Sequence, residues 1–518
     1  MQLLWLVFGI TVLWATSSEA ACINNGGGVW TVSALNATEM NACISAASSG
    51  NTINVPAGST SWSITLPSNK DLNIVGATDV TCSGGEGTAN YSCSAGATRT
   101  TITGSPAFTL DMGASHTLSG FVFTGGSGER ISCEGNQNTN KHFRVHHNVL
   151  ISTAGWQPIR CKGGNNGIHP QGIWDHNRIE GGVSIHTNGT LNQFDDSCST
   201  CQHQIWAENT PLGDSTKVIY VEGNYFLMAG SNTTNFTDGN YGGRVVIRFN
   251  RTQGPTITAF EFHSPQGANR GFQRWEAYHN ATVDLDTTNS CFHGMGSIRG
   301  GTGVFFNNSM SGSIAGCNYS IILDNVRSQW TSSVDGVGPC NGSSPWDQNV
   351  SGQQGWHCRD QIGTGRDLAQ WSHATTPSWN QEIKPAYIWG NTRSGAPTTA
   401  FVDTDGRNTA HIQANRDFYD HSSAAGSPQT VGVRSGPIAN RAAGCTVGVA
   451  YWATDEGEWN NTNGSTPDGR LYKCTAPNTW SLYYTPFSYP HPWTATASGG
   501  GGGGALLPPP APTNLRVQ

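Results

Sequence analysis

One short phrase recurs along this chain: a run of strand-forming residues that ends on an asparagine, two positions after a side chain of varied chemistry. Most neighbouring copies are 26 to 30 residues apart. A regular interval of this length is typical of repeat proteins, in which each unit stacks on the one before it. The phrases are FRVHHN ending at Asn148, GIWDHN at Asn177, YVEGN at Asn224, VIRFN at Asn250, EAYHN at Asn280, VFFNN at Asn308 and YIWGN at Asn391.

The sequence before the phrases also favours strands. Runs such as TINVPAG, ITLP, LNIVG and TTITG are each closed by turn residues, and no helical pattern separates them. Residues 38–47, TEMNACISAA, are the exception, because their apolar spacing predicts a helix that stops at the following Ser-Ser-Gly. We therefore expect an all-β protein, a coil of parallel strands with three short strands per turn and a helical cap at its N-terminal end.

The helix-and-strand segment TEMNACISAASSGNTINVPAG, the strand LSGFVF and the asparagine-terminated phrases resemble the right-handed parallel β-helix proteins of the pectin-lyase-like superfamily. The resemblance covers residues 21–393. It implies that the asparagines stack at one turn of successive coils and hydrogen-bond to one another, a structural role. Within the superfamily the chain is similar to secreted bacterial β-helix proteins of unassigned activity, so no catalytic residue is carried over.

The sequence divides into five expected segments. Residues 1–20 contain an apolar run and a small-x-small cleavage site, which indicate a signal peptide. The β-helix domain is expected over 21–393, and a small C-terminal β cap containing a hairpin over 394–493. A Gly- and Pro-rich linker follows over 494–512. Residues 513–518 resemble the opening of a fibronectin type III module.

Cysteine usage and charge indicate the setting of the protein. Fourteen cysteines fall into couples close in sequence, which is typical of disulfides in a secreted or cell-surface protein. A formal net charge of −7 without a basic stretch argues against a nucleic-acid partner. We expect no membrane span once the signal is removed. The couples are Cys22 with Cys43, Cys82 with Cys93, Cys133 with Cys161, Cys198 with Cys201, Cys291 with Cys317, Cys340 with Cys358 and Cys445 with Cys474.

Aligning the phrases on their asparagines separates two kinds of position, because side chains alternate along a strand. The odd positions before the asparagine are apolar and are expected to line the interior, Phe249 among them. The even positions are expected to face outward. Two residues before the asparagine they form a column of His146, Asp175, Glu222, Arg248 and Tyr278, and farther back they include Arg244, Arg274 and Glu276.

Adjacent strands lie about 4.8 Å apart, so this column forms a ladder in which each group can reach the next. We predict a groove that binds a polysaccharide or surface glycan, with His146, Asp175, Glu222 and Arg248 as the catalytic candidates. The substrate-binding candidates are Arg244, Arg274, Glu276, Tyr278, His263 and Trp206, the last in a loop expected to project between the second and third phrases. Glu261-x-His263 would share one face of its strand, with Arg299 on a later strand as a further candidate.

Two reactions fit such a groove. β-Elimination of a uronic acid polymer needs a cation beside the substrate carboxylate and a base for the adjacent proton. Arg248, Arg244 and His146 suit these roles, and Asp175 with Glu222 are candidates for holding Ca²⁺. Glycoside hydrolysis needs two carboxylates, such as Asp175 with Glu222 or Glu222 with Glu276.

Two other interpretations stay open. The charged column can be a set of weak surface ion pairs without a catalytic role. The protein as a whole can be a non-catalytic adhesion protein whose coil binds glycans or serves as a stalk, since a fold does not imply a function.

Overall fold

The computed structural model describes the greater part of the chain, from Cys22 to Ala495 with internal gaps. The signal segment expected over 1–20, nearly all of the linker over 494–512 and the module start over 513–518 lie outside these residues. The described residues are 22–125, 128–135, 138–151, 159–162, 169–181, 185–188, 206–209, 211–228, 235–239, 241–263, 270–286, 291, 293–325, 357–368, 381–403 and 411–495.

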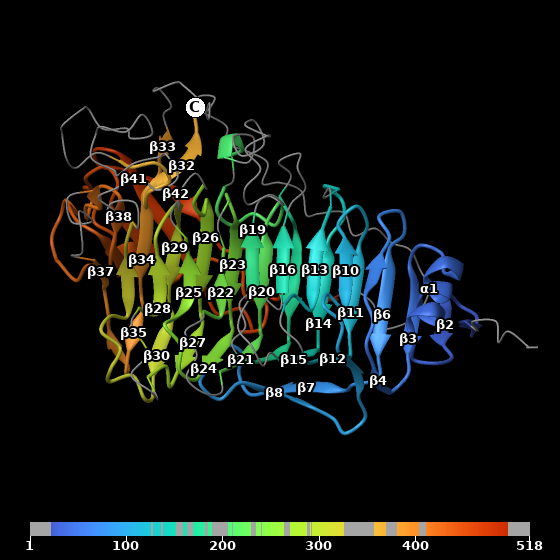
Figure 1. Ribbon diagram of the computed structural model, residues 1–518. Helices are drawn as coiled ribbons and strands as arrows, with labels where there is room; N and C mark the ends of the chain where they lie inside the picture. The colour runs from blue at the N-terminus through green and yellow to red at the C-terminus, as the bar shows by residue number, and fades with distance from the viewer. Residues whose placement is uncertain are drawn as a thin grey trace, which may run out of the picture.

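The fold is all-β, with three long sheets whose strands are almost all parallel. They run side by side along the length of the molecule, with the N-terminal helix at one end (Figure 1). We call them sheets A, B and C. Along most of the chain, successive strands enter sheets C, A and B in rotation, so neighbours within a sheet differ by three in strand number.

Sheet A contains thirteen strands among the described residues. In spatial order they are β1 (Cys22–Asn24), β2 (Val29–Val32), β3 (Asn51–Val55), β6 (Leu72–Gly76), β11 (His116–Ser119), β14 (Phe143–His146), β17 (Gly172–Asp175), β20 (Ile219–Glu222), β23 (Arg244–Arg248), β26 (Arg274–Tyr278), β29 (Thr302–Phe306), β34 (Ala386–Trp389) and β38 (Phe418–Tyr419).

Sheets B and C accompany it. Sheet B consists of β4 (Gly58–Thr60), β9 (Thr100–Ile102), β12 (Val122–Phe123), β15 (Val149–Ile151), β18 (Arg178–Glu180), β21 (Tyr225–Leu227), β24 (Arg251–Gln253), β27 (Ala281–Val283), β30 (Ser309–Ser311), β35 (Thr392–Arg393) and β36 (Ala396–Pro397). Sheet C consists of β5 (Ile64–Leu66), β10 (Phe108–Asp111), β13 (Ile131–Glu134), β16 (Ile159–Lys162), β19 (Ile185–Asn188), β22 (Thr237–Asp238), β25 (Thr258–Phe262), β28 (Gly294–Ile298), β31 (Ile321–Leu323) and β37 (Ala400–Val402).

The remaining elements are smaller. Helix α1 (Ala37–Ala46) begins at Asn36, whose side chain accepts from the Glu39 amide as an N-cap should. Hairpins are formed by β7 (Val80–Ser83) with β8 (Ser92–Ala95) and by β32 (Thr364–Asp367) with β33 (Gln381–Ile383). The C-terminal sheet contains β39 (Val433–Gly436), β40 (Ala450–Ala453), β41 (Arg470–Ala476) and β42 (Thr479–Tyr484), and short 3₁₀ turns span Ile438–Asn440 and Pro492–Ala495.

The phrase asparagines form a continuous hydrogen-bonded stack at the turn between sheets A and B. The Asn224 amide donates from Nδ2 to Asn250 Oδ1 at 3.1 Å, and Asn250 donates to Asn280 at 3.0 Å. The same oxygen of Asn250 also accepts from the Asn224 backbone N–H at 2.9 Å. All of these groups are buried, so the stack satisfies polar atoms that have no access to water.

The residue before each stacked asparagine has a left-handed backbone, which turns the chain out of sheet A and into sheet B. Glycine adopts this conformation without strain, and it stands there in two of the phrases. The φ angles are 51° at His147, 54° at His176, 60° at Gly223, 56° at Phe249, 53° at His279, 51° at Asn307 and 65° at Gly390.

Side chains at the predicted interior positions fill a single core between the three sheets. Val145, Trp174 and Ile247 of sheet A are buried there together with Phe226 and Phe260 from the other sheets. Phe249 is a correction to the predicted interior column. Its left-handed backbone turns the ring outward, where it stacks on Tyr489 with centroids 3.6 Å apart.

The C-terminal sheet and the segment after it lie along the outer face of sheet A, not only at the end of the sheets where a cap was expected. Val246, Phe306 and Trp389 of sheet A share a second apolar core with residues of the C-terminal sheet such as Trp452 and Tyr484. Phe306 stacks on Trp389 with centroids 4.4 Å apart. Sheet A is therefore buried on both faces along this stretch.

Five of the predicted cysteine couples are disulfides. These are Cys22–Cys43, Cys82–Cys93, Cys133–Cys161, Cys291–Cys317 and Cys445–Cys474. The other two couples involve Cys198, Cys201 and Cys340, which lie outside the described residues. Within the described part of the chain, no helix is long and apolar enough to cross a membrane.

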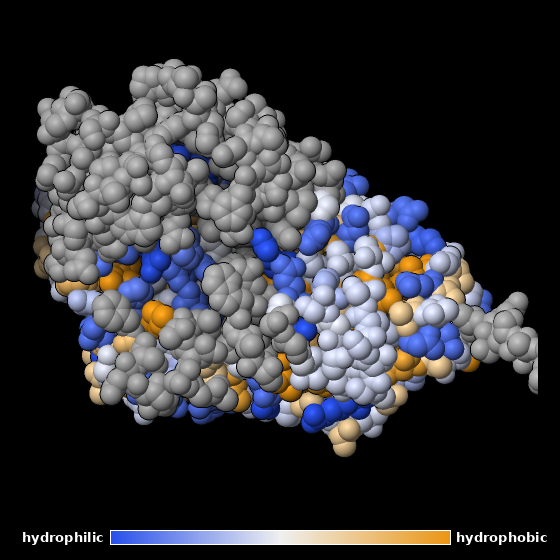
Figure 2. Space-filling view, viewed as in Figure 1, coloured by the Kyte–Doolittle hydropathy of each residue, from blue (hydrophilic) through white to orange (hydrophobic). Residues whose placement is uncertain are grey.

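The surface in view is mostly hydrophilic where residues are described, with small scattered apolar patches (Figure 2). The large apolar side chains exposed in the described ranges are dispersed over the chain: Ile23, Leu368, Ile383, Val431, Val447 and Leu482. Single exposed apolar residues are normal for a protein surface and indicate no docking site.

Replacing one stacked asparagine tests the energetic weight of the stack. Asn250→Ala removes the acceptor of the Asn224 amide and the donor to Val221 O. Because each unsatisfied buried group costs about 1–3 kcal/mol, we expect the free energy of unfolding to fall by about 3 kcal/mol or more in urea denaturation. Asn41→Ala, at an exposed position of α1, is the control. A loss below about 1 kcal/mol for Asn250→Ala would contradict this role.

Buried neutral histidines should make stability depend on pH, and His279 isolates the effect. Burial lowers the pKa of His279 to about 4. Between that value and the unfolded pKa of about 6.5 the unfolded chain binds a proton that the folded chain does not, so stability is lost as pH falls through this window. The variant His279→Asn carries the residue that the next phrase has at the equivalent position, Asn307. In this variant the slope of unfolding free energy against pH should be shallower by about 1.4 kcal/mol per pH unit. Urea denaturation from pH 4 to 7 measures it, and an unchanged slope contradicts it.

Candidate functional site

The predicted ladder of ionisable residues lies in register across sheet A. His146 is opposite Asp175, Asp175 opposite Glu222, Glu222 opposite Arg248, and Arg248 opposite Tyr278. Tyr278 belongs to the second apolar core, on the outer face of sheet A, where Arg248 donates to its hydroxyl and Glu222 accepts from the His491 N–H. The alternation of side chains therefore predicted both the register and the face correctly.

The middle of the ladder is a buried ion pair. Arg248 Nε donates to Glu222 Oε2 at 2.8 Å, and both side chains have no exposed surface. The other nitrogens of Arg248 donate to the Tyr278 hydroxyl at 2.9 Å and to the backbone carbonyls of Phe487 and Ser488 at 2.6 and 2.8 Å. Glu222 Oε1 accepts from the His491 backbone N–H at 3.0 Å. The segment 487–491 thus occupies the space in which a substrate was expected.

The neighbouring substrate-binding candidates are covered in the same way. Glu276 accepts from the Gly213 N–H at 2.9 Å and from the Tyr484 hydroxyl at 2.7 Å, and it also pairs with Arg274. Arg244 donates to Gln273 Oε1 at 2.8 Å. The exposed fraction of Arg244, Arg274, Glu276 and Tyr278 is 3% or less.

Trp206 is also fully buried, with the Arg270 guanidinium 4.5 Å from its ring centroid, so it does not present its ring to solvent. Most of the loop that was expected to carry it lies outside the described residues.

These observations correct the prediction of an open groove on this face. Alternation specifies that a side chain points away from the core, but exposure also depends on what packs over it. Here the cover comes from residues more than two hundred positions later in the chain. The assignment of catalytic roles to Glu222 and Arg248 stays a prediction, and in this conformation neither side chain can contact a substrate.

At the N-terminal end of the ladder His146 is half-buried, whereas Asp175 is fully buried. Asp175 accepts from Arg144 Nε at 3.0 Å and from its NH2 group at 2.8 Å, and its Oδ2 lies 3.0 Å from His176 Nδ1. His176 Nε2 lies 2.9 Å from Glu86 on the β7–β8 loop. Burial alone would lower the pKa of His176, but hydrogen bonds with the two carboxylates raise it to about 10. The imidazolium therefore links Asp175 to Glu86 at neutral pH.

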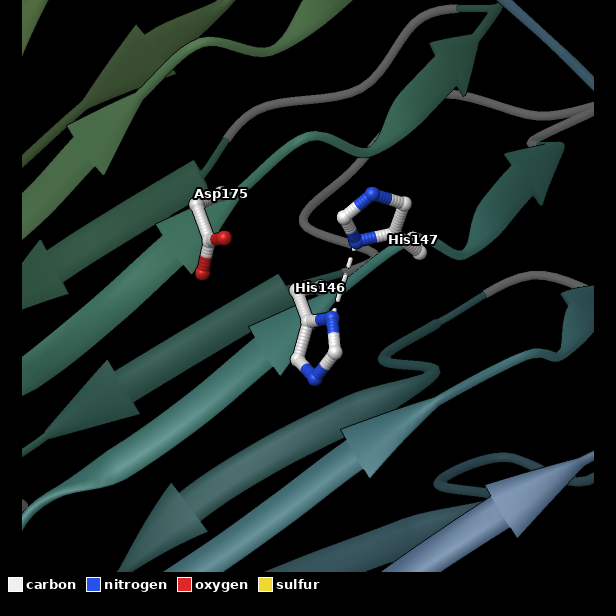
Figure 3. Close-up of side chains that lie close together, drawn as sticks. All are labelled: His146, His147 and Asp175. Atoms are coloured by element: carbon white, nitrogen blue, oxygen red, sulfur yellow. Dashed lines mark hydrogen bonds between the residues drawn. The ribbon is translucent and has the colours of Figure 1, made fainter. Parts of the chain in front are cut away.

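His146 and His147 point toward each other beside Asp175, and their Nδ1 atoms are 2.9 Å apart (Figure 3). Burial lowers the pKa of His146 to about 3 and that of His147 to about 4. Both rings are therefore neutral at physiological pH. Asp175, His146 and His147 each offer a potential metal ligand, and these atoms lie within 4.8 Å of one another.

Sheet C carries a second cluster on its outer side. Asp238 ends β22, Glu261 belongs to β25, and His263 follows that strand. His263 Nε2 lies 3.2 Å from Asp238 Oδ1 and 3.4 Å from Glu261 Oε1. The prediction that Glu261 and His263 share one face is confirmed by this contact. The ligand atoms of the three residues lie within 4.8 Å of one another, so the group could also hold a cation.

Two further side chains extend this cluster across neighbouring strands. Arg299, just beyond β28, approaches Glu261 Oε1 at 2.8 Å and Asp324 Oδ2 at 3.8 Å. Although burial opposes it, the Asp238 and Glu261 carboxylates raise the pKa of His263 above its ordinary value. We call Asp238, Glu261, His263, Arg299 and Asp324 the sheet C cluster.

The side chains of the sheet C cluster keep between 6% and 16% of their surface exposed, unlike the middle of the sheet A ladder. Three carboxylates, an imidazole of raised pKa and a guanidinium lie within contact distance, so the guanidinium can bind an anionic sugar group and the other side chains can exchange protons with it. Asp238 and Asp324 were not singled out in the sequence, because the sheet C strands carry no asparagine that marks their register.

Comparisons with known proteins give no family assignment: no family model, no curated protein and no solved structure matches the chain.

Breaking the buried pair on sheet A tests whether it is structural. Glu222→Gln leaves Arg248 without a counter-charge, and we expect a loss of about 3–5 kcal/mol in the free energy of unfolding. Glu180→Gln at the pair Arg178–Glu180, whose side chains are 27% and 28% exposed, should change it by less than about 1 kcal/mol. Urea denaturation of both variants measures the difference. Equal, small losses would show that the ladder does not hold the C-terminal segment.

Proposed function

We propose that the protein is an extracellular enzyme that cleaves an acidic polysaccharide at the sheet C cluster. We further infer that the rotation of the chain through its three sheets is a right-handed parallel β-helix of the pectin-lyase-like kind, with α1 as its N-terminal cap. The disulfides support an oxidising, extracellular location.

The observation that carries the proposal is the pair Asp238 and Glu261. Their nearest carboxylate oxygens are within 4.8 Å, and both side chains retain some exposure. Retaining glycosidases place their carboxyl groups about 5–5.5 Å apart, whereas inverting enzymes need about 6.5–9.5 Å to admit a water. The separation therefore favours hydrolysis with retention, in which one carboxylate attacks the sugar and the other protonates the leaving oxygen.

Arg299 provides the positive charge that an acidic substrate requires, and His263, whose pKa is raised by the neighbouring carboxylates, lies against the same Glu261 carboxylate. The guanidinium can take a uronate carboxylate in a bidentate hydrogen bond in place of its contact with Glu261. A cation at this position also acidifies the proton beside the carboxylate, which is the requirement for β-elimination. Elimination is therefore the second candidate, with Glu261 or Asp238 as the base and Arg299 as the electrostatic partner.

The proposal predicts that Glu261→Gln lowers kcat/KM on the responsive glycan by about 10²–10⁴-fold, the range for losing a general acid or base. The assay is a panel of polyuronates with and without Ca²⁺, read as reducing sugar and as absorbance of unsaturated ends. Reducing sugar without absorbance indicates hydrolysis, and both together indicate elimination. Glu180→Gln, on sheet B, is the matched control.

Three outcomes would contradict the proposal. Activity retained within about twofold in Glu261→Gln would exclude the sheet C cluster as the active site, since a catalytic acid or base contributes far more. A loss of the same size in Glu180→Gln would show a non-specific effect. No product from any glycan, together with glycan binding by the intact protein, would favour the non-catalytic adhesion protein.

A further inference from the structure

A second group of metal-ligating side chains lies on another sheet, at the turn between sheets A and B. His146 and His147 meet there beside Asp175 (Figure 3). None of the three belongs to the sheet C cluster, and the proposed catalytic chemistry does not use them. A metal site at this turn is therefore independent of the proposed function.

The backbone holds the two rings in place. His147 has a φ of 51°, its N–H donates to the Asp175 carbonyl at 3.3 Å, and its carbonyl accepts from the Gly120 N–H at 3.1 Å. His146 is the last residue of β14, paired with Asp175 in β17. Adjacent residues normally point to opposite faces of a strand. The left-handed backbone at His147 brings the second ring back beside the first.

The spacing of the rings suits chelation by both nitrogens. The Nδ1 atoms are 2.9 Å apart. With Zn–N bonds of about 2.05 Å, an ion between them would subtend an angle of about 90°, and opening the gap by about 0.4 Å would give the tetrahedral angle. The two rings can therefore bind one ion after a small side-chain rotation.

Asp175 provides a third ligand that is already oriented. Its two oxygens accept from Arg144 and contact His176, which uses three of its roughly four lone-pair positions. Partners of this kind orient a ligating carboxylate and are typical of the outer shell of metal sites. Arg144 and the His176 imidazolium are both positively charged and repel a cation, so the affinity should be lower than that of a site with two free carboxylates.

We propose that His146, His147 and Asp175 form a binding site for a first-row transition dication of the Zn²⁺ class. Two imidazoles and one carboxylate suit Zn²⁺, Cu²⁺ or Ni²⁺ and do not suit Ca²⁺, which takes oxygen ligands. His146 and His147 are half-buried, so an ion reaches them from solvent and a water completes the coordination. A bound ion would link the neighbouring strands β14 and β17 of sheet A beside the β7–β8 hairpin.

The test is isothermal titration of ZnCl₂ into the metal-stripped full-length protein. His147→Asn should remove one bound Zn²⁺ per chain or weaken it at least about tenfold. Asparagine fits the left-handed position, because Asn307 occupies the equivalent place before Asn308. His279→Asn changes the equivalent residue of another phrase and is the matched control, expected to bind as the wild type does. His263→Gln should also retain this site, whatever the sheet C cluster binds.

A wild-type protein that binds no Zn²⁺, or a His147→Asn variant that binds as the wild type does, would overturn the proposal. Loss of the same Zn²⁺ in His279→Asn would also overturn the proposal, because the loss of binding would then come from a general disturbance of the fold and not from a missing ligand. A crystal soaked in ZnCl₂ checks the wild type directly. An anomalous peak between the two Nδ1 atoms supports the site, and its absence at saturating Zn²⁺ excludes it.

Discussion

The hydrogen-bonded stack of asparagines is the interaction on which the rest of this structure depends. Parallel strands from successive repeats have no tight turn to set their register, and a slip of one residue would exchange the inner and outer faces. The stack prevents such a slip, because each asparagine binds both the next asparagine and the backbone of the neighbouring strand. The left-handed residue before each asparagine turns the chain at the same point in every phrase. All side-chain columns follow from this alignment.

The outer faces of sheets A and C differ in a way that bears on function. The outer face of sheet A is aromatic and is covered by the C-terminal sheet and the segment after it. The charged groups on this face bond to the chain's own backbone: Arg248 donates to the carbonyls of Phe487 and Ser488, and Glu222 accepts from the N–H of His491. The outer side of sheet C keeps carboxylates, a histidine and an arginine in partial contact with solvent. The same repeat therefore presents one closed and one accessible face.

The half-buried His146 and His147 and the fully buried Asp175 lie at the edge of that cover, close to where Glu86 of the β7–β8 loop meets both His176 and Tyr489. The N-terminal hairpin, the middle of sheet A and the C-terminal segment are joined at this point. An ion bound there would add to a junction between parts of the chain that are far apart in sequence. Such an ion would couple binding to the architecture at this corner of the molecule.

Much of the fold could be predicted from local patterns. The periodic asparagines, the apolar odd positions and the helix over 38–47 (observed as Ala37–Ala46) indicated parallel strands, their register and the interior column. The same alternation placed His146, Asp175, Glu222 and Arg248 on one outer face. Phe249 departed from the pattern because its left-handed backbone reverses the direction of the side chain. The pairing of five cysteine couples also followed from their proximity in sequence.

The candidate sites depended on contacts between distant segments. The alternation of side chains along a strand shows on which side of the strand each one lies, and this was enough to predict the column of His146, Asp175, Glu222, Arg248 and Tyr278. Whether that column meets solvent was decided by residues 484–491, which no local pattern places over sheet A. The sheet C cluster likewise unites Asp238 and Glu261, from two strands, with Arg299, which follows a third, and no sequence pattern marks the register of these strands. The physical reason is that periodicity encodes direction and register within a repeat, whereas burial and charge pairing arise only when separate segments pack together.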